Sequence, residues 1–215
     1  MIPTTFLQEE LRRYCEENSD VSGAYLAVIE RITNLETLAP QMLSGVLQGR
    51  LLSTLSKLHK PKCILEIGTF TGYSALCLAE GLIENGILHT IEVDDKYDKI
   101  IDFIKSEVPL AKKIVFHKAD AIPYIPTLDL SIDLAFIDAS KKDYLKYLKI
   151  IEPYMNKGSL LISDNVLYYG KVIDKIKDQD TTILNQYNKY LKVSPNWDTM
   201  ILPFRDGISI AQKLY

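Results

Sequence analysis

Two short apolar segments with a helical stretch between them constrain the fold of this chain more than any other feature. They span residues 134–138 and 160–165, and each ends in polar side chains. Continuous apolar runs of this length are typical of strands buried on both faces of a parallel sheet. Between them, apolar residues recur at helical spacing, and Gly158 is placed to turn the chain back toward the second strand. The pattern predicts a right-handed βαβ unit and so an α/β fold.

The side chains that end the two segments are oxygen donors: Asp138 after the first, and Asp164 with Asn165 after the second. Open α/β sheets bind ligands beyond the carboxyl ends of their strands, and neighbouring strands lie about 4.8 Å apart. The three side chains can therefore direct oxygen atoms to one hard cation, such as Mg²⁺ or Ca²⁺. The alternative is that Asp138 caps the following helix and that the other two residues make a turn.

The rest of the chain from residue 61 repeats the alternation of strands and helices. Further strands are predicted at residues 63–67, 87–93, 113–116, 199–202 and 208–212. Helices are predicted at residues 73–83, 96–108 and 172–192. The last two strands are joined through the turn sequence Arg205-Asp206-Gly207, which favours a hairpin. Five βα steps and a terminal strand pair predict a doubly wound sheet with a hairpin at its edge.

The chain before the first predicted strand has helical patterns. Asp20 and Pro40 are placed to begin the second and third of three helices. A length of 215 residues suits one domain with one hydrophobic core. Within that domain, residues 1–215, we expect residues 1–60 to form a helical cap or dimerisation region and residues 61–215 to form a Rossmann-like core.

Composition excludes some partners and compartments. A net charge of −3 gives no overall attraction to nucleic acid or to anionic membranes. No apolar run approaches the roughly 20 residues of a membrane span, and the N-terminus does not resemble a secretory signal. The 3 cysteines and 3 histidines have no ligand or disulfide spacing. We therefore expect a cytoplasmic protein with no membrane partner.

The loop after the first strand, residues 68–74, has the features of a nucleoside-binding loop. Gly68 allows a tight turn, and the following helix presents N–H groups that favour a carboxylate or phosphate. A dinucleotide site would require glycine where Phe70 stands, because the pyrophosphate must approach the backbone. S-adenosylmethionine fits better, with its carboxylate on the Gly68 loop and Ser74 and its ribose on Glu92. In the alternative, the glycines only reverse the chain and Glu92 is solvated.

Four motifs together resemble one family. They read Gly49-Arg50-Leu51-Leu52, Leu65-Glu66-Ile67-Gly68-Thr69-Phe70-Thr71-Gly72-Tyr73-Ser74, Phe136-Ile137-Asp138-Ala139-Ser140-Lys141 and Asp164-Asn165-Val166-Leu167. The combination is similar to the cation-dependent O-methyltransferases, which include catechol and caffeoyl-CoA O-methyltransferases and small bacterial relatives. The resemblance, from about Pro40 to the C-terminus, implies a seven-stranded Rossmann-like methyltransferase sheet. It also implies S-adenosylmethionine as donor, a divalent cation (Mg²⁺, Ca²⁺ or Mn²⁺) and a homodimer.

The resemblance also implies roles for individual residues. The donor-binding set comprises Met42, Ser44, Glu66, Gly68, Phe70, Ser74, Glu92, Asp120, Ala121 and Asp138. Within it, Asp120 and Ala121 would lie beside the adenine. The metal ligands would be Asp138, Asp164 and Asn165, and Lys141 would be the catalytic base with Asp138 beside it. The alternative for Lys141 is one charge among several on a solvated helix face.

The chain departs from its relatives at two positions expected near the acceptor. Ser140 stands where many relatives have an acid, and Tyr168 stands where they often have Trp. The acceptor is therefore the least determined part of the prediction.

The predicted function is transfer of a methyl group from S-adenosylmethionine to a hydroxyl of a small catechol-like or phenolic acceptor, with a divalent cation. One alternative within the family is a tRNA 5-hydroxyuridine O-methyltransferase, whose RNA would contact Lys171, Lys175, Lys177, Tyr168 and Tyr169. Another, from a different class, is a non-catalytic nucleoside-binding dimer.

Overall fold

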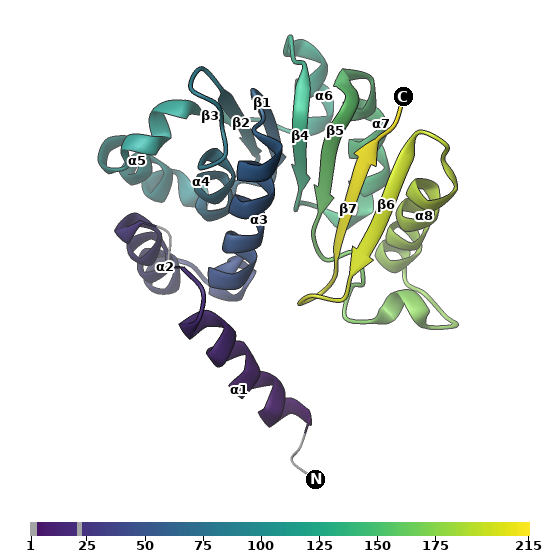
Figure 1. Ribbon diagram of the computed structural model, residues 1–215, viewed down its shortest axis with the longest axis horizontal. Coiled ribbons are helices and arrows are strands. Elements are labelled where there is room, and N and C mark those ends of the chain that lie inside the picture. Colours follow the sequence, from purple (N-terminus) through teal and green to yellow (C-terminus); the bar gives the residue numbers. More distant parts are fainter. Residues whose placement is uncertain (1–3, 21–22) are drawn as a thin grey trace.

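The computed structural model describes residues 4–20 and 23–215, with side chains from residue 9 onward. Its centre is a seven-stranded sheet in the order β3-β2-β1-β4-β5-β7-β6 (Figure 1). The strands are β1 (Cys63–Ile67), β2 (Ile87–Glu92), β3 (Ile114–Lys118), β4 (Ile132–Ile137), β5 (Met155–Ser163), β6 (Trp197–Leu202) and β7 (Ile208–Lys213). The first five are parallel, whereas β7 is antiparallel to both of its neighbours, β5 and β6. The predicted doubly wound sheet with an antiparallel terminal strand is confirmed.

Helices cover both faces of the sheet. They are α1 (Thr4–Glu17), α2 (Ala24–Glu36), α3 (Gly45–His59), α4 (Tyr73–Ala79), α5 (Asp98–Glu107), α6 (Ala121–Tyr124), α7 (Tyr144–Ile151) and α8 (Gln179–Val193). Side chains of α2 to α5 pack in one hydrophobic cluster with the sheet, and side chains of α6, α7 and α8 pack in a second. Helix α1 extends away from this body (Figure 1).

The central strands are buried on both faces, as their continuous apolar sequences predict. In β4, Leu134 and Phe136 belong to the cluster beneath α4, while Ala135 and Ile137 belong to the cluster beneath α7. Alternate residues of a strand point to opposite faces, so a strand between two helical layers needs apolar residues throughout. This burial fixes the register of β4, and so it fixes where the strand delivers Asp138.

Some details of the predicted elements are wrong. Helix α2 begins at Ala24, after Gly23 and without a side-chain cap, so Asp20 does not cap it. Pro40 begins only a short 3₁₀ helix, Pro40–Met42, because the chain is extended at Leu43 and Gly45 has φ +72°.

Gly158, with φ +89°, lies inside β5 and does not end the preceding helix. The helix after the glycine loop ends at Ala79, earlier than its apolar pattern suggested. These differences concern element ends, which do not move the strand ends that carry the site.

The N-terminal segment packs on the sheet domain in part. Leu26, Ile29 and Leu52 are buried in the cluster that α4 and α5 form with the sheet. The roles predicted for residues 1–60, a cap or a dimerisation region, stay predictions. No helix among residues 4–20 and 23–215 has both the length and the apolar character that crossing a membrane requires.

Candidate active site

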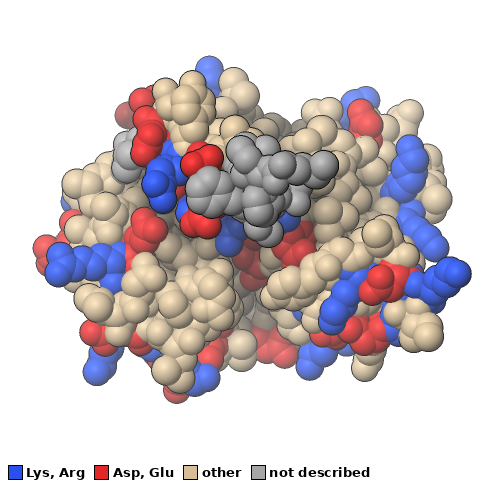
Figure 2. Space-filling model, turned by 90° about the horizontal axis from the view of Figure 1, so that it is seen from below, with Lys and Arg blue, Asp and Glu red and all other residues tan. Residues whose placement is uncertain are grey.

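Two adjoining cavities open at the carboxyl ends of the parallel strands. The smaller has a volume of about 330 Å³ and the larger of about 550 Å³. Figure 2 looks onto this edge and shows a furrow between the two halves of the molecule, with acidic side chains inside it. Strand β1 has β2 on one side and β4 on the other, so the chain order reverses there, which is where open α/β sheets bind ligands. The two cavities share Met42, Gly68, Phe70, Asp138 and Ala139.

Gly68 brings the ends of β1 and β4 into contact. Its φ is +102°, and a Cβ at this position would lie 2.0 Å from the carbonyl oxygen of Asp138. The N–H of Asp138 donates to the carbonyl of Ile67 at 3.0 Å, and the N–H of Gly68 donates to Ile91 at 3.0 Å. Only glycine permits this approach, so Gly68 shapes the floor that both cavities share.

Asp138 and Asp164 follow neighbouring strands at the same height. Ile137 and Ser163 are partners in the β4–β5 register, and the N–H of Asp164 donates to the carbonyl of Ile137 at 3.0 Å. Asp164 is only 4 % exposed. Its burial, and secondly the charge of Asp138, raise the pKa of Asp164 to about 6. The two carboxylates are therefore close enough to repel each other.

Asn165 completes the predicted ligand set at the smaller cavity, which all three side chains line. It has φ +55°, a conformation that Asn tolerates better than most residues, and its N–H donates to Asp164 Oδ1 at 2.7 Å. In the described part of the chain, no three His, Cys, Asp or Glu side chains are grouped for a metal. The set thus needs the amide oxygen of Asn165 as its third ligand.

Lys141 lies over the same cavity and not on a solvated helix face. Its Nζ donates to Asp138 Oδ1 at 3.0 Å and to the Tyr144 hydroxyl at 2.9 Å. Tyr144 is fully buried and donates to the carbonyl of Asp164 at 2.7 Å. Burial raises the pKa of Tyr144 well above its usual value, so the phenol remains a neutral donor. Neighbouring Lys142 instead lines the larger cavity.

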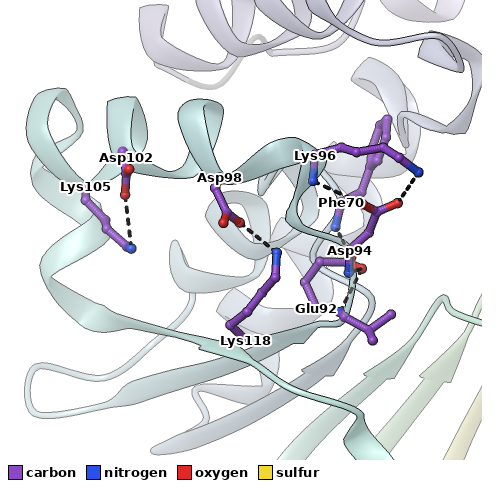
Figure 3. A network of polar contacts seen from close by, with 9 residues as sticks. Phe70, Glu92, Asp94, Lys96, Asp98, Asp102, Lys105 and Lys118 are labelled. Atoms are coloured by element: carbon purple, nitrogen blue, oxygen red, sulfur yellow. Dashed lines mark hydrogen bonds and ion pairs between the residues drawn. The ribbon is translucent and has the colours of Figure 1, made fainter.

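Glu92 holds the glycine loop beside the larger cavity. One carboxylate oxygen accepts from the N–H of Phe70 at 2.9 Å, and the other accepts from Val93 and Asp94 at 2.9 Å each (Figure 3). The oxygen that accepts from Phe70 has one donor and so retains capacity for another. The carboxylate is therefore fixed in direction yet still able to accept from a ligand hydroxyl.

The other donor-set residues divide between the two cavities, with one exception. Ser44 and Ser74 line the smaller cavity, and Asp120 and Ala121 line the larger one. Glu66 lines neither: it is fully buried on β1 and accepts from the Thr90 hydroxyl at 2.5 Å. Its Oε1 has no hydrogen-bond partner among the described residues. Burial raises the pKa of Glu66 to about 8, so the group is largely protonated at neutral pH.

Tyr168 and Ser140, the two departures from the family pattern, line different cavities. Tyr168 lines the smaller cavity, as expected of a residue near the acceptor. Ser140 lines the larger cavity, with Glu92 and Asp120.

Two residues of this site were not predicted from the sequence. Gln48 is fully buried on α3 and donates from Nε2 to Asp164 Oδ2 at 2.6 Å. Arg205 donates to Gln48 Oε1 at 3.0 Å and lines the smaller cavity. The available signal was a polar residue, Gln48, on the apolar face of a helix directly before the Gly49-Arg50-Leu51-Leu52 motif.

The sheet order and the two cavities define the class of the protein, an α/β enzyme with a nucleoside-type site beside paired carboxylates. The family model described as O-methyltransferase matches residues 16–214. The chain belongs to this family. The predicted enzyme class, an S-adenosylmethionine-dependent O-methyltransferase, is confirmed.

Relatives and solved structures agree with this assignment. The chain is 29% identical over 223 residues to a caffeoyl-CoA O-methyltransferase of Populus kitakamiensis, covering 96% of this chain and 94% of that protein. It is 34% identical over 174 residues to a catechol O-methyltransferase of Niastella koreensis, covering 76% and 79%. The structure of the O-methyltransferase TomG from Streptomyces achromogenes in complex with SAM superposes with a TM-score of 0.89, at 25% identity and 96% coverage of each chain. The SAH-bound Podospora anserina methyltransferase PaMTH1 gives 0.89, at 25% identity, with 100% and 99% coverage.

Proposed function

We propose that this enzyme methylates a hydroxyl group of a small catechol-like or phenolic acceptor, with a divalent cation held by Asp138, Asp164 and Asn165. One observation carries the proposal: Asp138 and Asp164 directly follow neighbouring strands at one cavity, and Lys141 contacts the first of them. Two relatives support this acceptor class, because they are named as a caffeoyl-CoA and a catechol O-methyltransferase.

The methyl donor, S-adenosylmethionine, is proposed to span both cavities. Glu92 would accept hydroxyl groups of its ribose, and Asp120 and Ala121 would flank its adenine. The methionine part would lie against Gly68 and Ser74, in the smaller cavity. The shared floor at Gly68 makes the two cavities one continuous path for a ligand of this shape. Solved relatives with SAM or SAH bound support this assignment.

The three proposed ligands fit a hard divalent cation. They offer only oxygen atoms, which suits Mg²⁺, Ca²⁺ or Mn²⁺. Burial, and secondly the negative charge of Asp138, raise the pKa of Asp164. Lys141 pairs with Asp138 at 3.0 Å, which leaves Asp164 with amide donors only. A divalent cation would supply the missing positive charge.

Lys141 is placed to accept the proton of the acceptor hydroxyl. A divalent cation held by Asp138, Asp164 and Asn165 would act as a Lewis acid and lower the pKa of the acceptor hydroxyl. Nζ of Lys141 would take the proton of the hydroxyl, and Asp138, which contacts it, would stabilise the resulting ammonium. The oxygen gains the methyl group and the donor sulfur becomes a neutral thioether, so the charge balances. Holding both reactants in line can lower the barrier by about 7–11 kcal/mol.

No observation favours the tRNA alternative over a small acceptor. Lys171 forms an ion pair with Asp178 at 3.1 Å, and the Tyr168 hydroxyl donates to Asp180 at 3.3 Å. Charge on this surface is thus partly balanced within the protein, which weakens its attraction for phosphate groups. The cytoplasmic location and the homodimer also stay predictions, and sedimentation velocity would test the second.

The test is methyl transfer from labelled S-adenosylmethionine to catechol or caffeoyl-CoA, with and without chelator. Asp164→Ala should abolish metal-dependent transfer and should bind S-adenosylhomocysteine almost as tightly as the native protein does. Asp102→Ala, which removes an exposed acid that pairs with Lys105, is the matched control and should keep full activity. Full turnover by Asp164→Ala in chelator would refute the proposed metal role.

A further inference from the structure

Gln48 presents a buried amide to the Asp164 carboxylate. The residue lies on α3, is fully buried, and donates from Nε2 to Asp164 Oδ2 at 2.6 Å. The other oxygen, Oδ1, accepts from the N–H of Asn165 at 2.7 Å. Each carboxylate oxygen therefore has its own donor, one from a distant helix and one from the adjacent backbone. Two hydrogen-bond donors, one on each oxygen, fix the rotation of the carboxylate about the Cβ–Cγ bond.

Arg205 determines which end of the Gln48 amide faces Asp164. A guanidinium can only donate, so the amide oxygen must point toward it. Arg205 Nη1 lies 3.0 Å from Gln48 Oε1, which leaves Nε2 directed at Asp164. The same guanidinium donates to the carbonyls of Leu43 (at 3.1 Å) and Ser44. Arg205 is thus held by the segment that leads into α3, next to the residue it orients.

The hairpin that carries Arg205 is bonded to the chain just beyond the predicted metal ligands. The carbonyls of Asp206 and Gly207 accept from the N–H groups of Leu167 and Val166 at 3.0 and 3.1 Å. A Cβ at Gly207 would lie 2.4 Å from Leu167 Cγ, so only glycine allows the two segments to pack this closely. The contacts form a closed circuit from the end of β5 to α3, to the hairpin and back to the loop after β5.

We propose that Gln48 is a positioning residue that holds the Asp164 carboxylate in the orientation used for the divalent cation, and that Arg205 sets the direction of Gln48. This inference rests on the proposed function, since the cation at Asp164 is itself proposed. A buried amide is costly unless its hydrogen bonds are made, and here both of its ends are bonded within the circuit. Residues that orient metal ligands in this way typically contribute 10- to 100-fold to metal affinity.

The direct test is cation affinity in the absence of turnover. Mn²⁺ binding is measured by electron paramagnetic resonance on the native protein and on Gln48→Met, which keeps the side-chain size but has no N–H to donate. We expect affinity for Mn²⁺ to fall about 10- to 100-fold in this variant. Affinity for S-adenosylhomocysteine, measured by calorimetry in chelator, should change less than about 3-fold, because Gln48 does not line either cavity.

The matched control is Ser56→Ala, on the same helix. Ser56 is also fully buried and donates to the carbonyl of Leu78 at 2.6 Å, but it has no contact with Asp164. Its removal should lower the melting temperature and leave Mn²⁺ affinity unchanged. Equal loss of Mn²⁺ affinity in the two variants would mean that α3 acts only through general stability, and the inference would be overturned.

Arg205→Met tests the same circuit from its exposed end. It should weaken Mn²⁺ binding, and its effect should largely disappear when Gln48 is already Met, because the two residues act in series. Unchanged Mn²⁺ affinity in both single variants would refute the positioning role. If the native protein itself bound no Mn²⁺, the proposed function would fail instead, so the two failures are distinguishable.

Discussion

The main-chain N–H of Phe70 donates a 2.9 Å hydrogen bond to the carboxylate of Glu92 (Figure 3). This bond joins the loop after β1 to the end of β2. The same carboxylate accepts from Val93 and Asp94, which fixes the turn that follows β2. One side chain thus sets the relative position of the two loops between which the donor is proposed to lie.

Glu92→Gln should therefore weaken donor binding. One oxygen becomes an NH₂ group, so the side chain loses an acceptor for either the Phe70 loop or the donor's ribose. Hydrogen bonds to charged groups contribute about 1.5–3 kcal/mol, so we expect affinity for S-adenosylhomocysteine to fall roughly 10- to 100-fold. Isothermal titration calorimetry measures this change directly.

The control for this variant is Asp98→Asn. Asp98 is a nearby exposed acid that pairs with Lys118 at 2.8 Å and touches neither cavity that would hold the donor (Figure 3). Its affinity should match that of the native protein. Equal affinities for Glu92→Gln and the native protein would show that Glu92 serves only the loops.

The fold was predictable because apolar periodicity reports burial, and burial of β4 and β5 on both faces determines their register. That register places Asp138 and Asp164 side by side. The ends of the helices were less predictable, since they depend on local backbone geometry. Because Gly45 has a positive φ, α3 starts there and not at Pro40. Helix α2 starts after Gly23 without any side-chain cap.

Gly68→Ala should disrupt the site and the fold together. The new Cβ would lie 2.0 Å from the carbonyl oxygen of Asp138 at a φ of +102°, so the ends of β1 and β4 must separate. We expect a loss of at least about 3 kcal/mol in the free energy of unfolding, measured by urea denaturation. The folded fraction that remains should bind S-adenosylhomocysteine poorly.

Gly170→Ala is the matched control for that substitution. Gly170 also has a positive φ, of +77°, but among the described residues other than its two chain neighbours no atom lies within 4 Å of its added Cβ. Its free energy of unfolding should fall only by the conformational cost of the positive φ, about 1–2 kcal/mol. Similar losses in the two variants would mean that the Gly68 contact with Asp138 has no separate importance.

Lys141→Met should lower kcat far more than it changes KM. A general base typically contributes 10²- to 10⁴-fold to the rate, and Nζ of Lys141 is the basic atom that contacts Asp138 at the smaller cavity. Lys142→Met, which removes the adjacent lysine beside the larger cavity, should retain most of the activity. Comparable rates for the two variants, or an unchanged pH–rate profile in Lys141→Met, would exclude Lys141 as the base.

The parts of the site that the sequence did not reveal are those made by distant side chains. Gln48 reaches Asp164 from 116 residues away in the sequence, and Arg205 reaches Gln48 from 157 residues away, in the turn before β7. Neither contact follows from spacing along the chain. By contrast, Gly68, Asp138 and Asp164 each directly follow a parallel strand, so their common edge follows from topology alone.

Glu66→Gln should change how the stability of the protein depends on pH. Burial, with smaller contributions from the charges of Asp138 and Glu92, raises the pKa of Glu66 from 4.5 to about 8. Between these values the folded state holds a proton that the unfolded chain has lost, so the free energy of unfolding falls as pH rises through this window. A neutral Gln keeps an oxygen to accept from the Thr90 hydroxyl and removes this loss.

The variant should therefore match the native protein near the acid end of the window and exceed it in stability above about pH 8, by on the order of 2–4 kcal/mol. Urea denaturation at a series of pH values measures the difference. Because Gln does not ionise, its profile should lack the decline that the native protein shows between the two pKa values. Parallel profiles for the two proteins would mean that Glu66 is ionised in the folded state, and that the Thr90 hydroxyl is enough to stabilise its charge.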